Sequence, residues 1–261
     1  MKLKFCFWMY LLMMSCQVLK VNSTEKKKFK LRISGGQAVN SIQLPYVVAL
    51  LSHTRYICTG SVITPSHVIT AAHCTYTRQA SELFIRAGSS LRKSGGVVVA
   101  VSLIINHPSF NSKNMDYDVS VLKLLQPLTY SQFIAPIPLA NQSHSWSPGT
   151  PALVSGWGFT KVGQTEDSRE LQATMIELKN AKICDEEFVP YTLTPRMLCG
   201  GLLEQGKNSC KGDSGGPLII NGLLAGIVSW GAETKCGLLG VPAVYSNLPV
   251  LRPFVDIALK I

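Results

Sequence analysis

Short apolar segments separated by Pro, Gly and Asn residues recur along the chain between residues 46 and 229. Segments of this length, rich in Val, Ile and Leu and bounded by turn residues, are typical of strands in a β-sandwich or β-barrel. The last twelve residues differ, because their apolar side chains recur at the spacing of an α-helix. The sequence therefore predicts an all-β fold that ends in one helix. We expect strands at 46–51, 68–71, 97–105, 119–125, 151–155, 218–220 and 223–229, and a helix carrying Leu251, Phe254, Val255, Ala258 and Leu259.

The basic charge of the chain is concentrated at its N-terminus. The 261 residues carry a formal net charge of +10, but the first 32 contain eight Lys or Arg residues and only one Glu. Residues 33–261 therefore carry a net charge of only about +3. Since we expect the basic segment to be removed, the charge gives no support to a nucleic-acid partner, and we expect none.

The first residues have the pattern of a secretory signal. Lys2 and Lys4 give a positive start, an apolar run follows at residues 5–16, and the small residue Ser23 suits a cleavage site. A membrane anchor is the competing interpretation, but the run is short for a bilayer span of about 20 residues. We expect a signal peptide at residues 1–23, secretion to the extracellular space and no membrane anchor.

The cysteine content fits a secreted chain. Cys6 and Cys16 fall in the signal, and an even number outside it favours disulfides, whose pairing the residues alone leave open. Zinc binding is the alternative, but no Cys-x-x-Cys pair occurs. Asn141 begins an Asn-Gln-Ser sequence that fits an N-glycosylation acceptor. The remaining cysteines are Cys58, Cys74, Cys184, Cys199, Cys210 and Cys236.

The motif Gly-Asp-Ser-Gly-Gly-Pro at residues 212–217 carries the most chemical information. It places Ser214 in a glycine-rich turn directly after Asp213. Such a turn can direct two backbone N–H groups toward one point, where the oxyanion of an acyl transfer can be stabilised. The motif predicts a nucleophilic serine.

A nucleophilic serine needs a base to take its proton and an acid to orient that base. His73 lies in Thr-Ala-Ala-His-Cys after an apolar strand, and Asp118 directly precedes the alternating strand 119–124. Asp116 is the rival acid, but its distance from the strand suits a solvated turn. The four other histidines fit surface or loop positions better: His53, His67, His107 and His144.

These motifs together resemble the chymotrypsin/trypsin family of serine proteases. The order His73, Asp118, Ser214 along the chain is that of chymotrypsin, and the resemblance covers essentially all of residues 33–261. It implies two six-stranded antiparallel β-barrels that meet near residues 140–150. It also implies the disulfides Cys58–Cys74, Cys184–Cys199 and Cys210–Cys236.

The resemblance also assigns binding roles. The backbone N–H groups of Gly212 and Ser214 would form the oxyanion hole, and a side chain at Gly212 would crowd the incoming carbonyl. Ser229, Trp230 and Gly231 resemble the edge strand that pairs with an extended peptide substrate. Taken alone, the Ser-Trp-Gly tripeptide fits an ordinary strand end equally well.

A zymogen cleavage site is implied at Arg32-Ile33, where Ser34 replaces the usual valine. Cleavage after Arg32 would free the Ile33 amine to pair with Asp213 and order the nucleophile loop. Residues 24–32 are then an activation propeptide. In the alternative interpretation, Arg32 merely ends a solvated basic run.

The primary specificity pocket departs from the trypsin pattern. Asn208 stands at its base, where an aspartate would attract Lys and Arg, and its walls resemble Gly231 and Ala243. The neutral base and the Ala243 methyl group predict a weak preference for Lys and Arg. Self-cleavage after Arg32 should then be inefficient, so we expect a trypsin-like protease as activator.

The sequence therefore predicts a secreted serine endopeptidase that hydrolyses peptide bonds through an acyl-enzyme. Protein or peptide substrates, the activator and protein protease inhibitors are the expected partners. We expect no cofactor and no metal, because residues 88–97, which match the calcium loop of the family, contain no carboxylate. The alternative is a weakly active or inactive homologue that acts as a binding or regulatory protein, with a non-protease esterase third.

Overall fold

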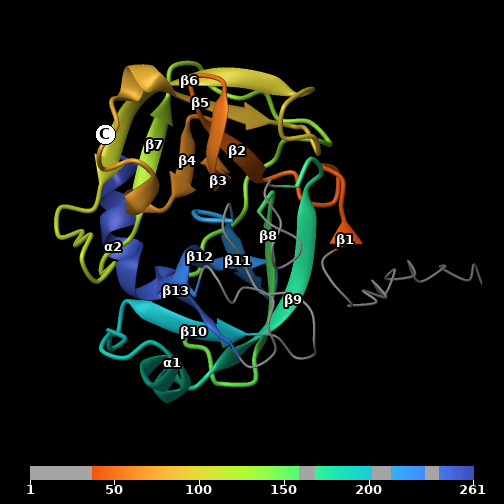
Figure 1. Cartoon of the computed structure of the whole chain (residues 1–261). Coiled ribbons are helices and arrows are strands. Elements are labelled where there is room, and N and C mark those ends of the chain that lie inside the picture. The colour runs from red at the N-terminus through yellow and green to blue at the C-terminus, as the bar shows by residue number, and fades with distance from the viewer. Residues whose placement is uncertain (1–36, 159–167, 202–212, 233–240) are drawn as a thin grey trace, which may run out of the picture. The chain divides into compact units, whose positions relative to one another are not determined.

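The computed structural model describes residues 37–158, 168–201, 213–232 and 241–261 (Figure 1). The chain divides into two units, Met1–Leu31 and Arg32–Ile261, and all the described residues lie in the second. Several expectations fall outside the described residues: the signal peptide, the propeptide, Arg32, Ile33, Asn208, Cys210, Gly212 and Cys236.

Six antiparallel strands close the first barrel, in the order β2-β3-β4-β7-β6-β5. The strands alternate as a barrel wall requires, because Leu83, Ile85 and Ala87 are buried while the residues between them are partly exposed. The core of this barrel is apolar, which provides its main stabilisation. The strands are β2 Val47–Ser52, β3 Arg55–Thr64, β4 His67–Thr70, β5 Leu83–Ala87, β6 Val97–Asn106 and β7 Ser120–Leu124.

A second set of six antiparallel strands runs in the order β9-β10-β13-β12-β11-β8, and pairing of β8 with β9 closes the ring. The short β1 Gln37–Ala38 adds to β9 from outside. The two six-stranded barrels that the resemblance implies are therefore confirmed. The strands are β8 Pro151–Gly156, β9 Gln172–Lys179, β10 Met197–Gly201, β11 Pro217–Ile220, β12 Leu223–Gly231 and β13 Ala243–Asn247.

The predicted C-terminal helix is α2, which spans Leu248–Ala258. Pro249 lies in its first turn, where a missing N–H costs no hydrogen bond. The helix buries Leu251, Val255 and Ala258, the face that the apolar spacing indicates. A second helix, α1 Ala181–Glu187, lies in the second barrel beside β10 (Figure 1). Within the described ranges, no helix has the length and apolar character needed to cross a membrane.

Candidate active site

His73 lies in a one-turn 3-10 helix, Ala72–Cys74, directly after β4. Ala72 is fully buried, so the turn packs tightly against the barrel. The disulfide between Cys74 and Cys58 fastens the turn to β3. The His73 side chain keeps 18% of its surface exposed, so it can meet a substrate while its backbone is fixed.

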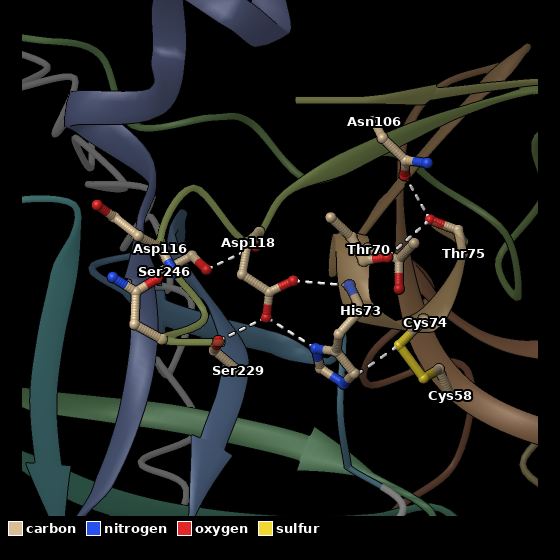
Figure 2. Close-up of polar contacts among 12 residues, drawn as sticks. Cys58, Thr70, His73, Cys74, Thr75, Asn106, Asp116, Asp118, Ser229 and Ser246 are labelled. Atoms are coloured by element: carbon tan, nitrogen blue, oxygen red, sulfur yellow. Dashed lines mark hydrogen bonds and ion pairs between the residues drawn. A yellow bond between two sulfur atoms is a disulfide. The ribbon is translucent and has the colours of Figure 1, made fainter. Parts of the chain in front are cut away.

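Asp118, just before β7, is completely buried and holds His73 through two hydrogen bonds (Figure 2). His73 Nδ1 lies 2.7 Å from Asp118 Oδ2, and the His73 backbone N donates to Oδ1 at 2.8 Å. A buried carboxylate only accepts hydrogen bonds, so Nδ1 carries a proton. The neutral ring therefore has its free lone pair on Nε2, the atom that a general base uses.

The second barrel supplies the other contacts of Asp118. Figure 2 shows the carboxylate between His73 and Ser229, whose Oγ donates to Oδ2 at 2.5 Å. Ser246 Oγ donates to the Asp118 carbonyl at 2.6 Å. The Ser229 hydroxyl replaces part of the water that burial removes from the charged group, while Ser246 fixes the backbone of Asp118. Asp118 is therefore held from both barrels. No sequence motif indicated the contribution of Ser246.

Ser214 lies in a turn before β11 that packs against the strands leading to His73. The Thr59 N–H donates to the Ser214 carbonyl at 2.8 Å. Gly215 has φ 78°, and a Cβ there would lie 2.1 Å from Thr70 Oγ1, so only glycine fits. Among the described residues, no hydrogen bond joins the Ser214 hydroxyl to His73, and His73 Nε2 lies 3.6 Å from Cys74 Sγ.

Asp213 points between two glycines of the second barrel. Its Oδ1 accepts a hydrogen bond from the Gly158 N–H at 2.8 Å. A Cβ at Gly156 would lie 2.3 Å from the same oxygen, and one at Gly158 would lie 2.5 Å from the carboxyl carbon. The glycines thus leave space for this carboxylate. Ile33, its expected partner, lies outside the described residues.

The predicted pocket walls face each other across two paired strands. Gly231 is the register partner of Ala243, and a Cβ at Gly231 would meet the Ala243 methyl group at 3.5 Å. Trp230 lies against Phe188 and Tyr191, with ring centroids 4.9 and 6.0 Å away. The two residues expected as walls therefore lie side by side, while Asn208, the expected base, lies outside the described residues. Neither Phe188 nor Tyr191 was indicated by a sequence pattern.

Two of the three implied disulfides, Cys58–Cys74 and Cys184–Cys199, are confirmed. The third, Cys210–Cys236, lies outside the described residues. Cys58, His73 and Cys74 bring three potential metal-ligand atoms within 4.8 Å of one another. Both sulfur atoms belong to the disulfide, however, so neither is a thiolate able to bind a metal.

Sequence reasoning misplaced two residues: His67, expected at the surface or in a loop, is buried in β4, and Asp116 also differs from its expected place. It does not lie in a solvated turn but is 7% exposed and hydrogen-bonded to Arg196 and Thr194 of the second barrel. Burial alone would raise the pKa of the Asp116 carboxyl. Hydrogen bonds from Arg196 and Thr194, together with the Arg196 charge, outweigh burial and lower this pKa below its usual range.

Comparisons with known proteins agree with this geometry. The family model described as Trypsin matches residues 33–255. The chain is 35% identical over 239 residues to a vitellin-degrading protease of Bombyx mori, covering 91% of this chain and 89% of that protein. It is also 35% identical over 251 residues to kallikrein-14 of Homo sapiens, and this match covers 95% of this chain and 92% of that protein.

A solved structure extends the likeness to three dimensions. Neuropsin, a serine protease expressed in the limbic system of mouse brain, has a TM-score of 0.79 and 27% identity. The match covers 87% of this chain and all of that one. The family model spans most of the chain, and both relatives are 35% identical over about nine tenths of it. The chain belongs to the trypsin family of serine endopeptidases.

Proposed function

We propose that this protein is a secreted serine endopeptidase that uses Ser214, His73 and Asp118 as a catalytic triad. The observation that carries the proposal is the buried Asp118 carboxylate, which orients His73 by accepting from both its ring and its backbone. An aspartate in this position stabilises the imidazolium that forms when the base takes a proton.

Acylation begins when His73 Nε2 takes the proton of Ser214 and the serine oxygen attacks the scissile carbonyl. The backbone N–H groups of Gly212 and Ser214 stabilise the resulting oxyanion. His73 then gives its proton to the leaving amine, and the peptide bond breaks to leave an acyl-enzyme. Water then takes the place of the amine: His73 takes a proton from the water as it attacks the acyl carbonyl and gives the proton to Ser214 as the ester bond breaks. The Ser214–His73 hydrogen bond that this route needs forms with the substrate complex, since catalytic contacts are often loose without substrate.

The substrate is a protein or peptide that pairs with the end of β12. Ser229, Trp230 and Gly231 end this strand, and an extended chain can add to such an edge through backbone hydrogen bonds. Ala243 faces Gly231 and narrows the pocket for the side chain before the scissile bond. With neutral Asn208 at the base, we expect polar or medium-sized apolar residues there rather than Lys or Arg. Protein inhibitors that present an extended loop would bind the same edge.

Activation follows cleavage between Arg32 and Ile33, after secretion and removal of residues 1–23. The new Ile33 amine then pairs with Asp213 and orders the nucleophile turn. Support comes from the packing of Asp213, because a Cβ at Gly156 or Gly158 would overlap its carboxylate. A basic-specific protease supplies the cut, since the enzyme's own pocket disfavours Arg32.

Secretion is also supported by two features of the fold, its disulfides and an exposed glycosylation sequence. The two described disulfides are typical of an oxidising compartment. Asn141 is exposed, and its Oδ1 accepts from both the backbone N and the hydroxyl of Ser143. We therefore propose N-glycosylation at Asn141, which a mass shift after treatment with a glycosidase would test.

The triad is tested by treating the purified chain with trypsin and labelling it with a fluorophosphonate probe. We expect the N-terminal sequence of the product to begin at Ile33, and we expect labelling that is lost in Ser214→Ala. A product that begins at Ile33 but neither reacts with the probe nor cleaves peptides would contradict the enzyme. That result would favour the alternative, a protease homologue that acts as a binding or regulatory protein.

A further inference from the structure

A partly buried ion pair joins the two barrels two residues before Asp118. Arg196, directly before β10, donates from Nε to Asp116 Oδ1 at 3.1 Å and from Nη2 to Oδ2 at 2.5 Å. Thr194 Oγ1 donates to the same Oδ1 at 2.8 Å. Because Asp116 leads into β7 of the first barrel, this two-pronged contact fixes that segment on the second barrel.

The segment that the ion pair holds has an unfavourable backbone. Met115 and Tyr117 both have φ 57°, a left-handed conformation that residues with a Cβ rarely adopt. Such residues persist only where their surroundings impose the conformation. Asp116 lies between them, and its Oδ1 also accepts from the Tyr117 N–H at 3.0 Å. The contacts of Asp116 therefore stabilise the turn that delivers Asp118 to His73.

Arg196 is itself firmly placed. Its carbonyl accepts from the backbone N of Asn247 at 2.8 Å, and the Asn247 side chain donates to Pro195 at 3.0 Å. Its guanidinium lies over the Tyr117 ring, 4.7 Å from the centroid. Arg196 thus holds both the carboxylate and the aromatic ring of the segment against a fixed strand.

We propose that Arg196 is a positioning residue for the catalytic pair, acting through Asp116 on Asp118. The inference rests on the proposed function, in which Asp118 orients His73. Without Arg196, the Asp116 carboxylate keeps its hydrogen bonds from Thr194 and Tyr117 but loses its two-pronged cationic partner, so it turns toward water or draws water into the junction. Either movement releases the left-handed turn at Tyr117 and shifts Asp118, which lies next in the chain.

The test compares kcat and KM of the activated enzyme for Arg196→Gln and Asp116→Asn with those of the wild type. We expect kcat to fall by about 10- to 100-fold with KM changed less than about twofold, because misplacement by an ångström costs this much. Arg196→Lys keeps the charge but not the two-pronged contact, so its kcat should lie between those of the wild type and Arg196→Gln. The kcat of the double variant Asp116→Asn/Arg196→Gln should fall no further than that of either single variant, because the two residues act as one unit.

Asp256→Asn is the matched control, because Asp256 also pairs with an arginine. Within α2, Arg252 Nε lies 2.6 Å from Asp256 Oδ1. This variant also removes a carboxylate from an arginine, and its kcat should stay within about twofold of the wild type. Circular dichroism and thermal unfolding identify any variant that fails to fold. Arg196→Lys then provides the milder perturbation.

A proton resonance gives a readout that does not need turnover. The proton between His73 Nδ1 and Asp118 resonates far downfield in NMR, and we expect this signal to weaken or shift in Arg196→Gln but not in Asp256→Asn. A folded Arg196→Gln with unchanged kcat and unchanged resonance overturns the proposal. A loss of thermal stability with an unchanged resonance also overturns it, by assigning the pair a structural role alone. A wild type that shows the resonance but hydrolyses nothing contradicts the proposed function instead.

Discussion

Replacing Gly215 by alanine tests how tightly the nucleophile turn is packed. A Cβ at this position would lie 2.1 Å from Thr70 Oγ1 and 2.3 Å from the Thr59 carbonyl oxygen, and φ is 78°. A left-handed backbone costs a residue with a Cβ about 1–2 kcal/mol. Forcing an extra methyl group into a packed site costs about 1–3 kcal/mol. We therefore expect Gly215→Ala to lower the free energy of unfolding by about 2–5 kcal/mol.

Gly222, in the turn between β11 and β12, separates the two costs. Its φ of 79° matches that of Gly215, but no atom of the described residues lies within 4 Å of a Cβ placed there. Gly222→Ala should therefore lose only the backbone contribution, about 1–2 kcal/mol. The difference between the two variants, about 1–3 kcal/mol, measures the overlap with β3 and β4.

Urea unfolding followed by tryptophan fluorescence gives both values, in a Ser214→Ala background that prevents self-digestion. In the active enzyme, the displaced turn should also lower kcat by about 100-fold for Gly215→Ala, because Ser214 moves with it. Gly222→Ala should keep its kcat. Equal losses of unfolding free energy in the two variants would refute the reasoning, since the nucleophile turn would then not be packed against Thr59 and Thr70.

Two further predictions concern pH and the disulfides. The lowered pKa of Asp116 means that its contribution to stability is present above the unfolded pKa of about 3.9 and is lost as pH falls through the lower folded value. The difference in unfolding free energy between wild type and Asp116→Asn should thus narrow in acid. A constant difference from pH 6 to about 2 would contradict this. Over that range Arg196 stays charged, and His107 becomes protonated in both proteins. The double variant Cys58→Ser/Cys74→Ser, which opens a bridge with a separation of 16 residues, should lose about 3 kcal/mol of stability and also kcat, because the candidate base adjoins this bridge. Removing the other described disulfide, with a separation of 15, should cost similar stability but keep kcat, as thermal unfolding and peptide hydrolysis would show.

Periodic segments of the sequence predicted their structure well. The alternating run before Leu125 became β7, and the apolar spacing of the last residues became α2. By contrast, β9 carries residues that favour a helix, Gln-Ala-Thr-Met-Ile-Glu-Leu-Lys, and no strand was expected there. Its pairing with both β8 and β10 overrides this local preference, because the hydrogen bonds and the core face come from distant strands.

The candidate site was predictable where its chemistry lies in one short motif. Ser214 in its glycine-rich turn and His73 beside a cysteine could be recognised locally, and the resemblance supplied Asp118. The environment of Asp116 could not be recognised, because its partner Arg196 lies 80 residues away. An aspartate among polar residues looks solvated until the opposite barrel is in place. Contacts between the barrels are the part of the site that no local pattern encodes.

The hydrogen bonds around Asp118 set an order for the maturation of the site. His73 and Asp118 belong to the first barrel, but Ser229 and Ser246 come from β12 and β13, the last strands along the chain. During synthesis the first barrel emerges before Ser229 can bond the Asp118 carboxylate and before Ser246 can bond its backbone carbonyl. A nascent chain that ends before β12 lacks both donors, so the second barrel does not yet hold Asp118 in place. We therefore expect the geometry of His73 and Asp118 to be complete only when the second barrel has formed.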